Sequence, residues 1–225
     1  MFDLSEKSLL GQLNPEDRQQ LLTLGTRRQF EAGGVLTRQG EAADTVYVLL
    51  DGFAKVTAIS EEGHLVFLAV RSQGELVGEV GVLDGSPRPT TVTATGAVVA
   101  LGVGGPLFLG FLARRPSAAT MVTRSVTEKL RFSIQRRLED VGSVRARLAR
   151  VLLDLGARWG RPGPRGTEIA VGLNQGEIAG LVGATERSVN EALADFRSLG
   201  TLSIGYRRVV IHDWSGLRKA AGSTP

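Results

Sequence analysis

The spacing of hydrophobic and polar positions changes along the chain, and each change predicts a different kind of element. In residues 27–103, short apolar and β-branched runs are separated by glycine-containing turns. Closely spaced short strands with such turns are typical of a β-sandwich or barrel. The predicted strands are residues 45–50, 53–59, 66–70, 91–94 and 98–103. Before them, leucines in residues 4–24 and Pro15 at a helix start predict one or two short helices that cap the β domain.

A long helix is predicted for residues 116–141. Pro116 suits the first turn of a helix, and no glycine follows before Gly142. Such a helix is about 39 Å long at 1.5 Å per residue. Apolar residues recur on it at spacings of three or four: Val122, Val126, Leu130, Ile134, Leu138 and Val141. This stripe needs one partner, either the protein's own β domain or the same helix of a second chain.

Residues 174–196 predict two short helices joined by a turn of two or three residues. Asn174 with Glu177 three positions later marks the start of the first helix, and Gly183 ends it. Thr185 is a second N-cap. Two helices this close cross steeply, as in a helix-turn-helix, whose second helix enters the DNA major groove. The same spacing also fits an ordinary helical hairpin in a core.

The helix-turn-helix interpretation nominates residues for contact with DNA. Those placed to reach base edges are Glu186, Arg187, Asn190 and Glu191. Those placed to contact phosphates are Gln175, Thr185 and Ser188. Residues 142–159 predict a further helix, 160–166 a loop and 167–171 a strand. Strands at 201–204 and 209–212 predict a β-hairpin wing, where Arg207 and Arg208 suit either phosphate contacts or a solvated turn.

Composition narrows the class of protein. Hydrophobic residues make up 42% and charged residues 22%, and no apolar run is long enough to cross a bilayer. The N-terminal residues carry no secretory signal, so we expect a cytoplasmic protein that does not bind membranes. The absence of cysteine excludes disulfides and sensing by thiols. No nucleophile–base pair or metal-ligand pattern is visible, so we do not expect an enzyme or a metal site.

The net charge of +4 is unevenly distributed. Residues 1–115 carry 10 Lys and Arg against 13 Asp and Glu, whereas residues 142–225 carry 12 against 7. A basic C-terminal part after a mildly acidic one suits a module that binds a polyanion, because Lys and Arg near phosphates release condensed counterions.

Residues 74–95 of the β region gather glycines around Glu79, with Arg88 nine residues later. Closely spaced glycines let several backbone amides point at one anion, and an arginine can form a bidentate salt bridge with a phosphate. A glutamate can accept a hydrogen bond from a ribose hydroxyl. These are the parts of a nucleotide-phosphate cradle, although a glycine-rich loop with a solvated arginine explains the same residues.

The segment G-E-L-V-G-E-V-G-V-L-D-G-S-P-R resembles the phosphate-binding cassette of cyclic-nucleotide-binding domains. With the helix-turn-helix, it makes residues 10–215 similar to the cyclic AMP receptor protein and fumarate-nitrate regulator (CRP/FNR) superfamily of bacterial transcription factors. The resemblance implies an α+β fold. Its parts are a β-roll (jelly-roll) sensor domain at 1–115, a dimerisation helix at 116–141 and a winged helix-turn-helix DNA-binding domain at 142–225.

The resemblance also implies partners and an effector. The partners are a second copy of the chain, an inverted-repeat operator in double-stranded DNA, and RNA polymerase. The effector is cyclic AMP or another cyclic nucleotide. The implied ligand-binding residues are Gly78, Glu79, Val80, Arg88, Thr90 and Ser133.

Several positions depart from the family pattern. Relatives that bind cyclic AMP carry Ser or Thr after the arginine, whereas Pro89 has neither a hydroxyl nor a backbone N–H. Phe132 stands where relatives present a threonine to the adenine, and Glu186 and Arg187 reverse the family order. Two alternatives therefore stay open: a regulator that binds DNA without nucleotide, and a cyclic-nucleotide-dependent subunit that acts on another protein.

Overall fold

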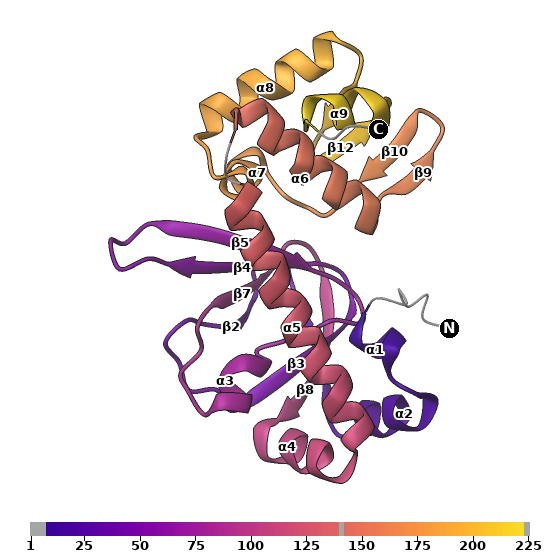
Figure 1. Ribbon diagram of the computed structural model, residues 1–225. Helices are drawn as coiled ribbons and strands as arrows, with labels where there is room; N and C mark the ends of the chain where they lie inside the picture. Colours follow the sequence, from indigo (N-terminus) through magenta and orange to yellow (C-terminus); the bar gives the residue numbers. More distant parts are fainter. Residues whose placement is uncertain (1–7, 140–141, 223–225) are drawn as a thin grey trace. The chain divides into compact units, whose positions relative to one another are not determined.

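The computed structural model describes residues 8–139 and 142–222, in two compact units that divide the chain between Ser133 and Ile134. The first unit contains two β-sheets with helices, and the second contains α6 to α9 with one further sheet (Figure 1). The elements up to α5 are α1 (Leu9–Gln12), α2 (Pro15–Thr23), β1 (Thr26–Phe30), β2 (Val35–Thr37), β3 (Thr45–Asp51), β4 (Ala54–Ile59), β5 (Leu65–Arg71), β6 (Leu76–Val77), α3 (Glu79–Asp84), β7 (Thr91–Ala94), β8 (Val98–Gly104), α4 (Gly105–Arg114) and α5 (Pro116–Glu139).

The first unit has three layers. Its sheets have the strand orders β1-β8-β3-β6 and β2-β7-β4-β5, with antiparallel pairing throughout. Successive side chains of β3 point to opposite faces. Val46 and Val48 belong to a core that includes residues of α1, α4 and α5, whereas Tyr47 and Leu49 belong to the core with residues of the second sheet. The sheet that contains β3 is therefore the middle layer, and the predicted β-roll is confirmed.

The N-terminal helices cap this β-roll, as predicted. Leu9, Leu10 and Leu13 are buried against the middle sheet. Asp17 of α2 is fully buried and accepts hydrogen bonds from Ser117 Oγ and Arg115 Nε, each at 2.5 Å. The hydrogen bond from Ser117, together with that from Arg115, lowers the pKa of Asp17. These contacts attach α2 to the start of α5.

Five elements of the first unit were absent from the sequence prediction. They are the strands β1, β2 and β6 and the helices α3 and α4. Strand β1 has the polar sequence T-R-R-Q-F and is largely exposed, while β6 has only two residues, so neither produces a recognisable alternation. In α3, glycines at both ends and within the helix resemble a loop composition.

Helix α5 starts at Pro116, as predicted, while residues 140–141 of the predicted helix lie outside the described part. Its apolar stripe does not face a single partner. Val122 is only 2% exposed, whereas Leu130 is 59% and Ile134 is 51% exposed. Each step of four residues turns a side chain by about 40°, because the helix has 3.6 residues per turn. The stripe therefore rotates from the β-roll toward solvent along the helix.

The second unit contains α6 (Val144–Trp159), β9 (Arg161–Gly163), β10 (Gly166–Ile169), α7 (Gln175–Val182), α8 (Glu186–Ser198), β11 (Leu202–Gly205), β12 (Arg208–Ile211) and α9 (Trp214–Ala220). Its sheet has the order β11-β12-β10-β9. The predicted loop at 160–166 is wrong in one respect, since β9 lies within it and pairs with β10. The prolines on either side of Gly163 made this strand look like a loop, because proline has no backbone N–H to donate. An edge strand such as β9 tolerates proline, since it has a neighbouring strand on one side only.

Candidate nucleic-acid interface and nucleotide pocket

Helices α7 and α8 form the predicted helix-turn-helix. Glu177 N donates to Asn174 Oδ1 at 2.8 Å and Asn174 N donates to Glu177 Oε2 at 2.9 Å, so both halves of the predicted capping box are present. Gly183 ends α7 at φ 65°, a left-handed conformation that favours glycine. The predicted apolar faces are buried: Ile178, Leu181, Val182, Val189, Leu193 and Phe196.

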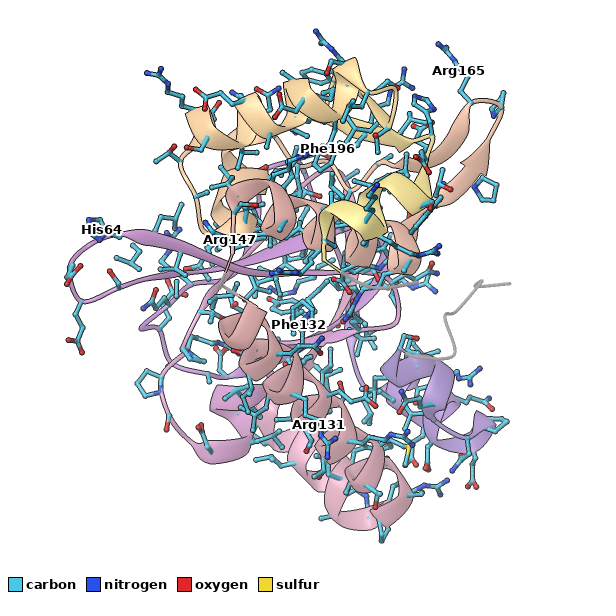
Figure 2. The ribbon with its side chains drawn as sticks, turned by 45° about the horizontal axis from the view of Figure 1, so that its top comes forward. His64, Arg131, Phe132, Arg147, Arg165 and Phe196 are labelled. Carbon is cyan, nitrogen blue, oxygen red and sulfur yellow. The ribbon has the colours of Figure 1, made fainter. Side chains whose placement is uncertain are left out.

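Arg147 of α6 holds the turn between the two helices. Its Nε donates to Val182 O at 3.0 Å and its Nη2 donates to Gly183 O at 3.1 Å. These carbonyls stand at the C-terminus of α7, where an arginine also interacts favourably with the helix dipole. Figure 2 labels Arg147 and the buried Phe196. The guanidinium carbon of Arg145 lies 5.0 Å from the centre of the Phe196 ring. The sequence reasoning missed Arg147, because no spacing signal connects it with a carbonyl 35 positions away.

The start of α8 presents charged side chains to solvent. Glu186, Arg187 and Glu191 are exposed, and Arg187 Nε lies 3.1 Å from Glu191 Oε1. Ser188 and Asn190 are half-buried. The Asn190 Oδ1 atom is buried and has no hydrogen-bond partner among the described residues. A base contact through that oxygen therefore requires the side chain to turn outward.

The residues nominated for phosphate contacts also lie at the surface of this unit. Gln175 is the exposed first residue of α7. The exposed Thr185 caps α8, since Ser188 N donates to Thr185 Oγ1 at 3.2 Å. A side-chain oxygen that accepts this bond still has its own O–H to donate, and the Ser188 hydroxyl lies 2.9 Å from it.

Strands β11 and β12 form the predicted wing, with Tyr206 and Arg207 as a two-residue turn. Arg207 has a φ of 52° and its guanidinium lies 5.9 Å from the Tyr206 ring. Arg208 is exposed beside Glu168, with Nη1 3.7 Å from Oε1. Both arginines therefore occupy the exposed tip of the hairpin. The second hairpin, β9–β10, carries Arg165 at its own tip (Figure 2).

In the first unit, the structure brings together the glycine, glutamate and arginine of the predicted cradle. Gly78 precedes α3 with a φ of 77°, a conformation suited to glycine. Arg88 is only 5% exposed, and its Nη1 and Nη2 donate to Gly78 O and Thr45 O, each at 2.6 Å. Asp44 Oδ1 lies 3.5 Å from Nη2. Arg88 is thus a buried, oriented cation and not a solvated loop residue.

Glu79 has a partner that the sequence reasoning missed. Lys129 Nζ of α5 donates to Glu79 Oε1 at 2.8 Å and to Leu76 O at 2.6 Å. The Lys129 and Glu79 side chains are 18% and 4% exposed, respectively. Lys129 lies seven residues after the buried Val122, and this spacing repeats a helix face. The sequence signal that was available for this pair is a single lysine, Lys129, on the apolar face of the helix, because such a lysine indicates a buried carboxylate opposite it.

The other predicted ligand residues are not joined to this cluster. Within the described ranges, the hydrogen bonds of Gly78, Glu79 and Arg88 do not involve Thr90 or Ser133. Val80 is 40% exposed, Thr90 is half-buried, and Ser133 is exposed on α5. Phe132 is half-buried on the same helix (Figure 2). The neighbouring Thr91 Oγ1 accepts a hydrogen bond from Gln39 N at 3.0 Å.

Comparison with known proteins gives one family model for each of the two candidate sites. Residues 27–115 match the family model of the cyclic nucleotide-binding domain, and residues 146–220 match that of the Crp-like helix-turn-helix domain. The chain is 30% identical over 203 residues to the transcriptional regulator LdrP of Thermus thermophilus, an alignment that covers 87% of this chain and 97% of that protein. The chain belongs to the CRP/FNR family of transcription regulators.

Other CRP/FNR proteins show similar agreement. A CRP-like cAMP-activated global transcriptional regulator of Mycobacterium tuberculosis is 29% identical over 194 residues, which are 85% of this chain and 86% of that protein. The crystal structure of a CRP-family transcriptional regulator from Thermus thermophilus matches with a TM-score of 0.75 and 28% identity, over 88% of this chain and 97% of that one. The protein is therefore a DNA-binding transcription regulator with a cyclic nucleotide-binding domain.

No helix within residues 8–139 or 142–222 has both the length and the apolar character needed to span a membrane. The candidate nucleotide pocket of this CRP/FNR regulator lies in the first unit, and the candidate nucleic-acid interface lies in the second.

Proposed function

We propose that this CRP/FNR regulator acts as a homodimer on an inverted-repeat operator, with half-sites about 34 Å apart, or one turn of DNA. The exposed first turn of α8, on a turn held by Arg147, is the observation that carries the proposal. The proposed base contacts are Glu186, Arg187, Asn190 and Glu191. The proposed phosphate contacts are Gln175, Thr185, Ser188, Arg207 and Arg208.

The dimer contact that we propose lies on α5. Leu130 and Ile134 are large apolar side chains that are more than half exposed on a long helix, and helices with such stripes pair along them. We retain the predicted division into a sensor at 1–115, a dimerisation helix at 116–141 and a DNA-binding domain at 142–225. RNA polymerase as a further partner and a cytoplasmic location stay predictions.

We further propose that a cyclic nucleotide, cyclic AMP or another, is the effector. The buried Arg88 supplies a cation for the phosphate, and a relative is described as cAMP-activated. The proposed ligand residues are Gly78, Glu79, Val80, Arg88, Thr90 and Ser133. A second candidate is that the protein binds DNA without a nucleotide. The observation in its favour is that Arg88 and Glu79 already have partners within the protein.

The DNA proposal is tested by selecting bound sites from random duplexes and measuring their affinity at several salt concentrations. We expect a two-fold symmetric site and a steep salt dependence, because arginine–phosphate contacts release counterions. Light scattering after gel filtration should give twice the chain mass of 23.9 kDa. Leu130→Asp should shift the protein toward monomer, whereas Thr120→Asp, an exposed control on the same helix, should not. A monomeric wild type without salt-sensitive DNA binding would contradict the proposal.

The effector proposal is tested by titration calorimetry with cyclic AMP and cyclic GMP. We expect saturable binding of one of them that Arg88→Ala abolishes. Arg38→Ala is the matched control, because Arg38 is an exposed arginine of the same unit that pairs with Glu41 at 3.6 Å. Circular dichroism must show that Arg88→Ala remains folded. If neither nucleotide binds while operator binding persists, the nucleotide-independent candidate replaces this one.

A further inference from the structure

The side-chain hydroxyl of Thr37 is an unusual buried polar group of the first unit. Thr37 is the last residue of β2, pairs with Val92 of β7, and is 5% exposed. Its Oγ1 atom is buried and has no hydrogen-bond partner in the part of the chain that the structure describes. Buried hydroxyls are nearly always hydrogen-bonded in folded proteins, so this one is available to a partner from outside the chain, such as a water or a bound ligand.

The side chains of Thr37 and Arg88 both lie close to Gly78. A Cβ atom added to Gly78 would lie 2.7 Å from Arg88 Nη1 and 3.1 Å from Thr37 Cγ2. The Thr37 methyl and Arg88 Nη1 therefore both lie over the Cα atom of Gly78, and a rotation about the Thr37 Cα–Cβ bond brings Oγ1 to the place of the methyl. The carbonyl of the same Gly78 accepts a hydrogen bond from Arg88, so the Thr37 methyl lies at the edge of the candidate cradle.

The chemistry at this point suits a phosphate. An arginine carries five N–H donors, and Arg88 directs two of its nitrogens at backbone carbonyls, which leaves N–H groups for an anion. A threonine hydroxyl can rotate its hydrogen toward an acceptor. The next residue, Pro89, contributes neither a hydroxyl nor a backbone N–H. A phosphate bound by Arg88 therefore receives no hydrogen bond from Pro89.

We propose that Thr37 Oγ1 donates a hydrogen bond to the phosphate of a bound cyclic nucleotide, in place of the hydroxyl that Pro89 cannot supply. This assignment rests on the proposed effector function. It makes Thr37 a ligand-binding residue that comes from a different strand than the cassette. The hydroxyl loses no hydrogen bond to the described residues when it turns toward the ligand.

The test compares three variants by titration calorimetry with cyclic AMP and cyclic GMP. Thr37→Val keeps the shape and removes the hydroxyl, so we expect the affinity for the bound nucleotide to fall about 10-fold or more. Thr37→Ser keeps the hydroxyl and should stay within a few-fold of wild type. Thr95→Val is the matched control, because Thr95 is 6% exposed and its hydroxyl donates to Phe53 O at 3.1 Å.

Thermal unfolding without nucleotide separates binding from packing. Thr37→Val should be at least as stable as wild type, because no hydrogen bond to the described residues is lost, whereas Thr95→Val should be less stable with unchanged affinity. Wild-type affinity in Thr37→Val would overturn the Thr37 assignment and leave the effector proposal intact. Equal losses of affinity in Thr37→Val and Thr37→Ser would also overturn it. A wild type that binds neither nucleotide would overturn both proposals.

Discussion

Replacing Lys129 by methionine tests the ion pair between α5 and Glu79 of the candidate nucleotide cradle. Methionine retains an unbranched side chain of similar length but removes the charge that lies 2.8 Å from Glu79 Oε1. The carboxylate then stays 4% exposed without its cation. Breaking a buried ion pair by removing one partner destabilises a protein by about 3–5 kcal/mol. Because Lys129 is 18% exposed, we expect a value near the lower end, about 3 kcal/mol.

The assay is urea unfolding followed by circular dichroism. With a slope of about 1–3 kcal/mol/M, a loss of about 3 kcal/mol lowers the midpoint by about 1–3 M. The fluorescence of Trp159 and Trp214 follows the second unit separately, because both tryptophans lie there. Arg124→Met is the matched control on α5, since Arg124 and Glu128 are 63% and 48% exposed and such a pair contributes only about 0–1 kcal/mol.

A double-mutant cycle identifies the cause of the loss. Glu79→Gln combined with Lys129→Met removes both charges, so the double variant should be more stable than the sum of the single losses implies. An additive result, or a Lys129→Met midpoint no lower than that of Arg124→Met, would refute the reasoning. In that case the contact between Lys129 and Glu79 would not contribute to the stability of the cradle.

Three further predictions concern the DNA-binding unit and the N-terminal helices. Arg187→Ala should reduce discrimination at one base pair by about 1–3 kcal/mol in competition binding, while Arg208→Ala should weaken all sequences alike and reduce the salt dependence; equal losses on every sequence from both would contradict these roles. Arg147→Ala should lower the free energy of unfolding by about 1–3 kcal/mol, because it leaves two carbonyls at the α7–α8 turn without their donor, and an unchanged urea midpoint would argue against this bracing. The pKa of Asp17 is lowered in the folded protein, so its contribution to stability is present at neutral pH and is lost as the pH falls below about 4. Arg115→Gln should therefore move acid unfolding, followed by circular dichroism, to higher pH, and an unmoved transition would be inconsistent with the pairing.

Local signals in the sequence were sufficient for the helix-turn-helix. The caps at Asn174 and Thr185 and the glycine at Gly183 act within three or four residues, and each appears in the structure as predicted. The β-roll was predictable for the same kind of reason, because β-branched runs such as that of β3 show which segments are buried strands. Where this local signal was weak, as in the polar strand β1, the prediction missed the element.

Contacts between distant segments were not predictable, even where their residues were noticed. Glu79 and Arg88 were identified from the glycine-rich pattern, yet nothing in that pattern shows Lys129 on Glu79 or Thr37 beside Arg88. The apolar spacing of α5 likewise predicted one stripe with one partner. The structure divides this stripe, because four-residue steps rotate around a helix and the β-roll covers only its first part.

The sequence by itself determined the order of the β-roll, the long helix and the winged helix-turn-helix, the caps of α7 and α8, and the family of the regulator, because the signals for these lie in residues close together in the chain. The tertiary structure alone decided which charges are already paired, which buried hydroxyl has no hydrogen-bond partner among the described residues, and which part of α5 stays exposed. Those properties depend on residues far apart in the chain, such as Glu79 and Lys129 at a separation of 50 positions. Their approach is set by how the sheets and helices pack around a shared core.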